Sequence, residues 1–132
     1  MEQLTITTSQ INEFQDVTAK IQEIIRKKGF NNGICQVFVP HTTAGVTINE
    51  NADPDVVKDL LYVLYMIFPA FKEYRHLEGN SSAHLKSSLI GCSLTIPVEN
   101  GRLCLGKWQG IYFCEFDGPR TRKLFVQLIE GK

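Results

Sequence analysis

The sequence carries no excess of charge of either sign and no long uninterrupted apolar run. Its 132 residues include 14 Lys and Arg against 14 Asp and Glu, a formal net charge of zero. Proteins that bind nucleic acid neutralise phosphates with clustered basic residues, so we expect no nucleic-acid partner. The longest mostly apolar stretch, Val56 to Phe71, contains Lys58 and Asp59. It is shorter than the roughly 20 residues that a membrane span needs, so we expect no membrane partner.

Closely spaced cysteines and the common cofactor motifs are also absent. The four cysteines include no C-x-x-C pair, which argues against a zinc ribbon or a thioredoxin-like site. The N-terminus shows no basic segment followed by an apolar run, so we expect no secretory signal, reduced interior thiols and a cytoplasmic location. Without a Walker loop, a G-x-G-x-x-G turn or a G-x-S-x-G elbow, nucleotide cofactors of those types and a nucleophilic serine are not supported.

The length and the hydrophobic pattern predict a single α+β domain over residues 1–132. A chain of this size can bury one core, and no linker rich in Gly, Pro or Ser divides it. Helical spacing is predicted from Ile11 to Lys28 and, after the Asp53-Pro54 start signal, over 54–68. Strands are predicted over 4–8, 34–39, 88–96, 109–117 and 122–128, with a hairpin turn at Asn100-Gly101.

This order of elements indicates a mostly antiparallel β-sandwich or curled sheet with two main helices. The helix over 54–68 is so apolar that we expect it to be buried or to face another subunit.

Three histidines are the first candidates for chemistry. His41 opens H-T-T-A-G after a predicted strand, and His76 and His84 bracket a polar loop. Three imidazoles with a carboxylate would suit a divalent ion of zinc type. The spacing alone does not bring the rings together, and the alternative is that one or two of the histidines cap loops and the rest are solvated.

Polar residues near the predicted helix start and in the last strands are further candidates. Asp53 is explained as a helix N-cap, whereas Glu50 has no such account. Glu115 shares a strand face with Ile111 and Phe113, so either that face is partly solvated or Glu115 lines a polar pocket. Arg120 follows a tight turn and can bind phosphate or carboxylate, or simply lie at the surface.

Several blocks in order along the chain carry a family resemblance. They are H-T-T-A-G from His41, N-E-N-A-D-P-D from Asn49, H-L-E-G-N from His76, A-H from Ala83, the stretch Ser88–Ile111 and F-D-G-P-R from Phe116. The chain resembles the YjbQ family of small proteins, described as secondary thiamine-phosphate synthases. It departs from the family pattern at Lys107, where Thr is usual, which bears on substrate preference if that position contacts the ligand.

The resemblance implies an α+β sandwich that assembles as a homotrimer, with polar pockets near the subunit interfaces. It also implies a weak transferase that condenses hydroxymethylpyrimidine diphosphate with thiazole phosphate. His41, His76 and His84 would hold a divalent metal ion, zinc or magnesium. Catalysis would involve Glu50, Glu115 and Arg120, and small phosphorylated molecules would be bound by Thr42, Thr43, Asn80, Ser87 and Arg120.

Two alternatives use the same residues. One is a metal-dependent hydrolase of a small phosphorylated compound, with water as the nucleophile. The other is a non-enzymatic trimer that binds a metal or a small anion.

Overall fold

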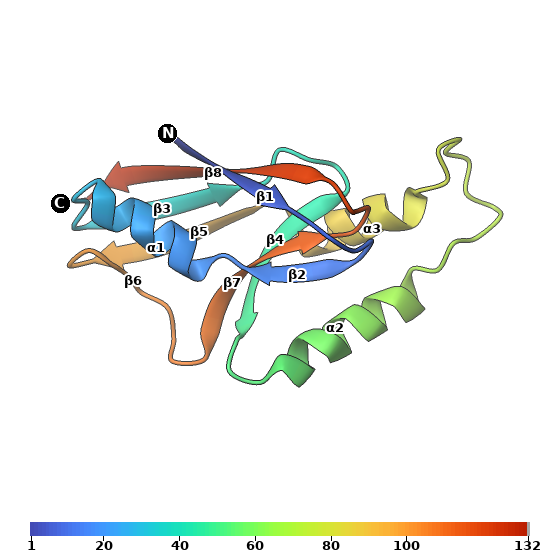
Figure 1. Cartoon of the computed structure of the whole chain (residues 1–132), viewed down its shortest axis with the longest axis horizontal. Helices are drawn as coiled ribbons and strands as arrows, with labels where there is room; N and C mark the ends of the chain where they lie inside the picture. Colours follow the sequence, from blue (N-terminus) through green and yellow to red (C-terminus); the bar gives the residue numbers. More distant parts are fainter. Residues whose placement is uncertain (132) are drawn as a thin grey trace.

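The computed structural model describes residues 1–131, which form one α+β unit of two antiparallel sheets with helices beside them (Figure 1). The strands are β1 (Glu2–Thr7), β2 (Glu13–Asp16), β3 (Gly33–Phe38), β4 (Ala44–Glu50), β5 (Ser93–Glu99), β6 (Arg102–Leu103), β7 (Gln109–Glu115) and β8 (Thr121–Glu130). The helices are α1 (Thr18–Lys27), α2 (Pro54–Ile67) and α3 (Ser81–Ile90). One sheet has the order β1-β8-β3-β5-β6 and the other the order β2-β7-β4. The predicted fold class is confirmed, with a third helix in addition.

The local signals for the α2 start and for the hairpin turn are both confirmed. The Asp53 side chain accepts a hydrogen bond from the Asp55 N–H at 2.9 Å, and Pro54 occupies the first helical turn. Asn100 and Gly101 have φ values of 52° and 77°, the positive pair that a two-residue hairpin turn requires. The turn pairs Glu99 with Arg102 across β5 and β6.

Two predicted elements are wrong. The helix expected from Ile11 begins only at Thr18, because Glu13–Asp16 pairs with β7 and a tertiary pairing overrides the helical spacing. The strand expected over 88–96 is divided: residues up to Ile90 belong to α3, and β5 begins at Ser93. Gly91, with φ 96°, ends the helix, because glycine has no Cβ and so tolerates the positive φ that helix C-termini commonly adopt.

Strand β7 lies between two hydrophobic clusters. Its residues Ile111 and Phe113 face the main core, which lies between the two sheets and α1. Its alternate residues Tyr112 and Cys114 face a smaller cluster that includes Leu64 of α2 and Ala83 of α3. Every residue of β7 after Gln109 is therefore buried.

Helix α3 is held tightly against β4. The Val46 N–H donates to the Gly91 carbonyl at 3.0 Å, and the Ser87 hydroxyl donates to the Ala44 carbonyl at 2.7 Å. A Cβ on Gly45 would lie 2.6 Å from the Gly91 oxygen, so only glycine allows this close approach. The contact fixes α3 beside the start of β4.

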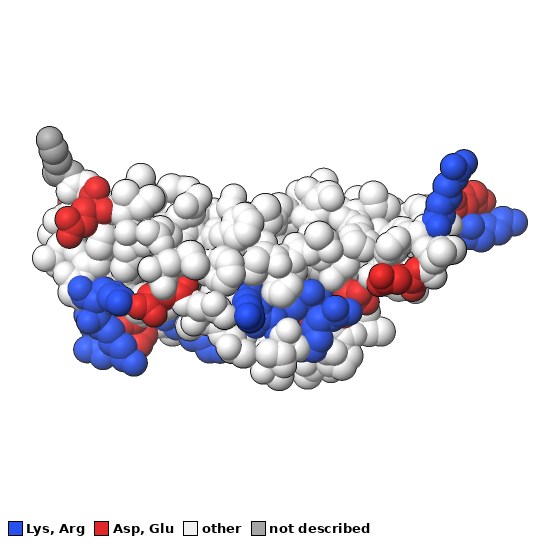
Figure 2. Space-filling view, turned by 90° about the horizontal axis from the view of Figure 1, so that it is seen from above, with Lys and Arg blue, Asp and Glu red and all other residues white. Residues whose placement is uncertain are grey.

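Helix α2 projects from the side of the three-stranded sheet (Figure 1) and buries little of its surface. Leu64 is its one buried residue, although most of its side chains are apolar. Burial within the chain is therefore the wrong explanation for this apolar helix. Figure 2, which is seen from above Figure 1 and so from the side away from α2, shows charged residues at the two ends and a group of basic residues at mid-length in the lower half of the view.

The cysteines and the helices bear on two further expectations. All four cysteines are free; Cys35 and Cys114 are buried as predicted, whereas Cys92 and Cys104 are exposed. Burial raises the pKa of the Cys35 thiol to about 11, so this thiol stays protonated at neutral pH. None of the helices in residues 1–131 is long and apolar enough to cross a bilayer.

Candidate functional site

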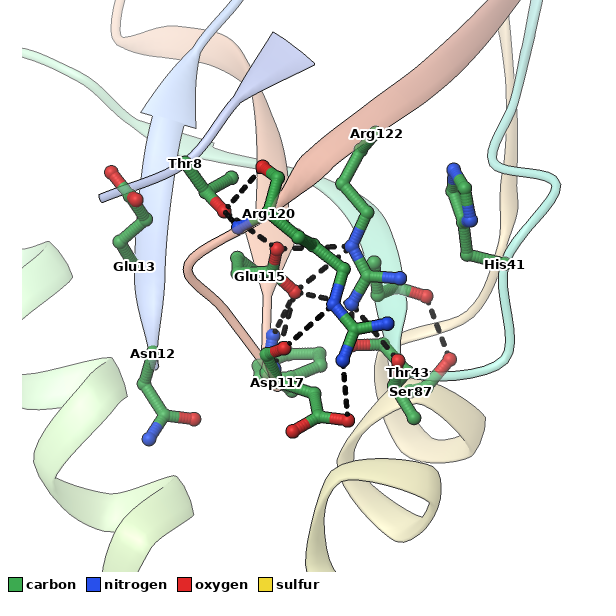
Figure 3. A network of polar contacts seen from close by, with 12 residues as sticks. Thr8, Asn12, Glu13, His41, Thr43, Ser87, Glu115, Asp117, Arg120 and Arg122 are labelled. Carbon is green, nitrogen blue, oxygen red and sulfur yellow. Dashed lines mark hydrogen bonds and ion pairs between the residues drawn. The ribbon is translucent and has the colours of Figure 1, made fainter. Parts of the chain in front are cut away.

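A buried ion pair between the two sheets organises one end of the molecule (Figure 3). Glu115 at the end of β7 and Arg122 near the start of β8 are 0% and 2% exposed. The Arg122 Nε donates to both Glu115 oxygens, at 2.9 Å and 3.1 Å, and its Nη2 also contacts Oε2. Both side chains point into the main core because each occupies the inward phase of its strand. Glu115 is therefore buried and paired with Arg122, and its strand face is not solvated at this position.

Neighbouring threonines and backbone groups complete the hydrogen bonding of this pair. The Thr8 hydroxyl donates to Glu115 Oε1 at 2.7 Å, and the Phe116 and Asp117 N–H groups donate to Oε2 at 3.1 Å. Burial opposes ionisation of the Glu115 carboxyl, but the bonds from Arg122, Thr8 and the Asp117 N–H outweigh it and lower its pKa. Glu115 is thus a stable anion that balances a buried cation.

A surface hollow of about 500 Å³ lies directly outside this ion pair. It is lined by Phe38, Val39, Pro40, His41, Thr42, Thr43, Cys92, Arg120 and Arg122. Arg122 Nη2 donates to the Thr43 hydroxyl and carbonyl at 2.9 Å and 3.1 Å, whereas its Nη1 makes no hydrogen bond within residues 1–131. The Thr42 hydroxyl is likewise without a protein partner in that range. The hollow thus offers hydrogen-bond donors that the described protein does not use.

His41 also lines the hollow. Its Nε2 accepts the Lys123 N–H at 2.9 Å, which a protonated imidazolium cannot do, so the ring is neutral and Nδ1 carries the proton. Burial is the main cause that lowers the pKa of His41, and the nearby Arg122 charge lowers it further. The Nδ1–H therefore remains a neutral donor at physiological pH.

Arg120 lies at the rim of the hollow and is held by the turn that precedes it. Its Nη2 donates to Asp117 Oδ2 at 3.0 Å and its Nε to the Asp117 carbonyl at 2.9 Å. Asp117 Oδ2 also accepts a hydrogen bond from the Asn80 Nδ2 at 2.8 Å, and this bond connects the turn to the start of α3. The Asn80 Oδ1 is buried without a donor.

The structure brings two of the three histidines together. His76, in the connector after α2, and His84, on α3, have ring centroids 5.1 Å apart at an interplanar angle of 89°. Residues 1–131 contain no group of three or more His, Cys, Asp or Glu side chains placed to hold one metal ion. His41 therefore does not join the other two in a three-histidine centre within one chain, because its ring is bonded to β8 beside the hollow.

The remaining predicted residues are divided between the hollow and other places. Thr42, Thr43 and Arg120 line the hollow, and Ser87 instead fastens α3 to Ala44. Glu50 lies at the far end of β4, six residues from Ala44 and roughly 20 Å away at strand rise. The structure does not bring Glu50 to the hollow.

Sequence reasoning missed Arg122, Thr8 and Asp117. A signal for Arg122 was present: it shares a period-two face with Leu124 and Val126, which are both buried. A cation in phase with core residues indicates a buried anion facing it, and Glu115 is the matching carboxylate on β7.

Comparison with known proteins places the chain in a family. The model of the UPF0047 protein YjbQ-like family matches residues 2–131. The chain belongs to the YjbQ family. It is 49% identical to the UPF0047 protein YugU of Bacillus subtilis over 98% of both chains. It is 50% identical to a UPF0047 protein of Methanocaldococcus jannaschii over 96% of this chain and 92% of that protein.

Solved structures of YjbQ relatives share the whole fold. A YjbQ/UPF0047 family protein of Clostridium acetobutylicum has a TM-score of 0.95 and 52% identity, covering 98% of this chain and all of that one. A YbjQ-like protein of unknown function from Sulfolobus solfataricus has a TM-score of 0.93 and 31% identity, covering 98% of this chain and 96% of that one. The family resemblance predicted from the motifs is confirmed.

The comparisons contradict the expected thiamine-phosphate synthase activity. The relatives in the YjbQ family carry only family names, and the Sulfolobus protein is described as being of unknown function. None of these names indicates that condensation, or a metal-dependent phosphate hydrolase. Membership of the family therefore establishes the fold without an activity.

The Lys107 departure from the YjbQ pattern lies away from the hollow. Its Nζ is 4.8 Å from the centre of the Trp108 ring, and Trp108 is exposed. Lys107 is not among the residues that line the hollow. The substitution forms a surface cation–π contact.

Replacing Glu115 tests the buried ion pair. Glu115→Gln leaves the Arg122 guanidinium buried without a counter-charge, so we expect the free energy of unfolding to fall by about 3–5 kcal/mol, measured by urea denaturation. Glu23→Gln, which breaks the exposed pair with Arg26, is the matched control and should leave the midpoint unchanged. Equal shifts in the two variants would contradict the central role of the buried pair.

Proposed function

We propose that the hollow beside His41 binds a small phosphorylated molecule or another small oxyanion. The observation that carries this proposal is the set of unused donors around one concave surface: Arg122 Nη1, the His41 Nδ1–H and the Thr42 hydroxyl. Arg120 at the rim adds a guanidinium, a group whose planar donors match phosphate and carboxylate oxygens. Such donors, fixed by the protein before the ligand arrives, stabilise an anion without reorganisation.

The rigidity of the hollow also supports this role. Arg122 is held by Glu115 and Thr43, and His41 is held by the β8 backbone. Because these side chains are already ordered, a ligand that binds to them does not have to offset the cost of immobilising them.

Removal of the rim arginine tests the anion site. Arg120→Gln should weaken binding of methyl phosphate by about tenfold or more, since a hydrogen bond to a charged group is lost. Binding is followed through the NMR shifts of the His41, Thr42 and Thr43 amides. The control is Arg102→Gln, which changes an exposed arginine on β6 and should bind as the native protein does. If neither methyl phosphate, dimethyl phosphate nor acetate shifts these amides in the native protein, the proposal is overturned.

We also propose that the His76–His84 pair binds a divalent metal ion. Two adjacent imidazoles suit zinc better than magnesium, which prefers oxygen ligands. Asn80, one helical turn before His84, has a buried Oδ1 without a donor and is a third candidate ligand. Two imidazoles are one fewer than a three-histidine catalytic zinc centre supplies, so the described residues of one chain do not by themselves fit the centre first expected.

Zinc titration separates this pair from His41. His84→Ala should abolish Zn²⁺ binding in isothermal titration calorimetry, whereas His41→Ala should leave it unchanged. Mg²⁺ should give no binding heat with any of the three proteins. If His41→Ala also lost Zn²⁺, or His84→Ala retained it, the two-histidine site would be wrong.

We further propose that the chain assembles with copies of itself through α2. The family resemblance implies three copies. Residues Tyr62, Val63, Tyr65, Met66 and Ile67 of α2 are between 49% and 64% exposed. A contiguous apolar surface of this kind on a folded protein is typical of an interface. A homotrimer that covers α2 would bury side chains that the single chain leaves in water.

A charge placed on this helix tests the assembly. Met66→Glu should reduce the mass measured by light scattering from three chains to one, because an unpaired carboxylate would be buried in the interface. Ile11→Glu makes the same change at an exposed apolar residue outside α2 and should preserve the trimer. A native protein that is monomeric at every concentration would refute this proposal.

The thiols support a cytoplasmic location. Cys92 and Cys104 are exposed and free, and exposed thiols persist in reducing compartments. We therefore propose the cytoplasm as the site of action.

A further inference from the structure

The positive charges around the hollow are already balanced. Arg122 is paired with Glu115, and Arg120 is paired with Asp117. His41 accepts a backbone N–H through Nε2 and is therefore neutral. The groups that line or support the hollow thus sum to no net charge, although they present several donors to it.

Two other cations lie nearby, and neither lines the hollow. Lys123 follows Arg122 on β8, so its side chain leaves the opposite face of the strand, and it is exposed. Lys86 is buried on α3, where its Nζ donates to the Asn12 side chain at 3.1 Å. Among the residues that line the hollow or pair with its arginines, the balance is therefore two arginines and two carboxylates.

We infer that the hollow selects oxyanions with one negative charge, a carboxylate or a phosphodiester, over dianions such as a phosphate monoester. This inference rests on the proposed anion site and specifies its ligand class. Attraction to fixed donors in a neutral surrounding grows in proportion to the ligand charge, whereas the cost of removing an ion from water grows with the square of that charge. A second negative charge therefore adds about three times the desolvation cost of the first, whereas it adds only the same attraction.

Asp117 is the residue that sets this preference. It holds Arg120 through its Oδ2 and cancels the charge of the one exposed arginine at the rim. Glu115 cancels Arg122 in the same way, but it is fully buried and required by the core. Asp117 can be neutralised without removing a residue that lines the hollow.

The native protein gives a first test with probes of matched shape. Dimethyl phosphate is a monoanion, and methyl phosphate is mainly a dianion at pH 7.5, since the second pKa of a phosphate monoester is about 6. We expect dimethyl phosphate to bind at least threefold more tightly, from NMR shifts of the His41, Thr42 and Thr43 amides at fixed ionic strength. Acetate is titrated in parallel and distinguishes a carboxylate site from a phosphodiester site.

Neutralising Asp117 gives a second test. Asp117→Asn leaves one uncompensated positive charge, whose attraction for a dianion is twice that for a monoanion. The fold-gain in affinity for methyl phosphate should therefore be about the square of the fold-gain for dimethyl phosphate. The native preference for the monoanion then falls by the fold-gain of dimethyl phosphate, and it reverses where that gain exceeds the native preference. Glu130→Gln is the control: it changes the total charge equally at the far end of β8, roughly 30 Å away at strand rise, and should alter neither affinity.

The outcomes separate this inference from the proposal on which it rests. If methyl phosphate binds the native hollow more tightly than dimethyl phosphate, or Asp117→Asn changes both affinities equally, the charge selection is overturned and the anion site stands. If none of the three probes shifts the His41, Thr42 and Thr43 amides, the anion site itself fails. A native preference for a monoanion that falls or reverses in Asp117→Asn supports both.

Discussion

The ion pair between Glu115 and Arg122 is the interaction on which this end of the molecule depends. Its carboxylate belongs to one sheet and its guanidinium to the other, so a single contact spans the sandwich. Burying two charges is tolerated only where their hydrogen bonds are satisfied, and here Thr8, Thr43 and two backbone N–H groups satisfy most of them. These bonds also fix three connecting segments, before β2, before β4 and before β8, at one place.

The hollow is a consequence of this arrangement. Because Glu115 and Thr43 occupy the inward nitrogens of Arg122, the outward nitrogen is left toward solvent. Phosphate sites commonly rely on uncompensated cations or on helix N-termini. In the YjbQ chain, by contrast, both arginines of the hollow are already paired with carboxylates. This pairing affects which anions the hollow prefers, and it does not remove the donors that would bind them.

The sequence predicted correctly those features whose conformation depends only on neighbouring residues, such as a helix start and a hairpin turn. Asp53-Pro54 starts α2 and Asn100-Gly101 closes a hairpin because capping and positive φ depend only on neighbouring residues. The helix predicted to begin at Ile11 is wrong in its first residues, because Glu13–Asp16 pairs with β7, about 100 residues away in sequence, and this pairing decides the conformation. Helix α3 was missed because its Ser, His and Lys residues show no clear apolar stripe, and its packing depends on Gly45 in another strand.

The candidate site was predicted in part for the same reason. His41, Thr42, Thr43 and Arg120 lie in connecting segments, where side chains that bind ligands concentrate, and all four line the hollow. The partner of Glu115 was not identified, because which strands face each other across a sandwich is not encoded in any short motif. The sequence did not predict that His41 lies apart from His76 and His84 for the same reason: their distances depend on how strands and helices pack, which no short motif encodes.

The double burial of β7 limits how this protein can vary. On an ordinary strand of a sandwich, alternate side chains reach water and tolerate replacement by residues of another size. From Gly110 to Glu115 no position offers that freedom, since one set of side chains fills the main core and the other set fills the cluster beneath α2 and α3. Substitution here must be matched by compensating substitution on a facing element, so divergence among relatives should proceed by coupled replacements along this strand.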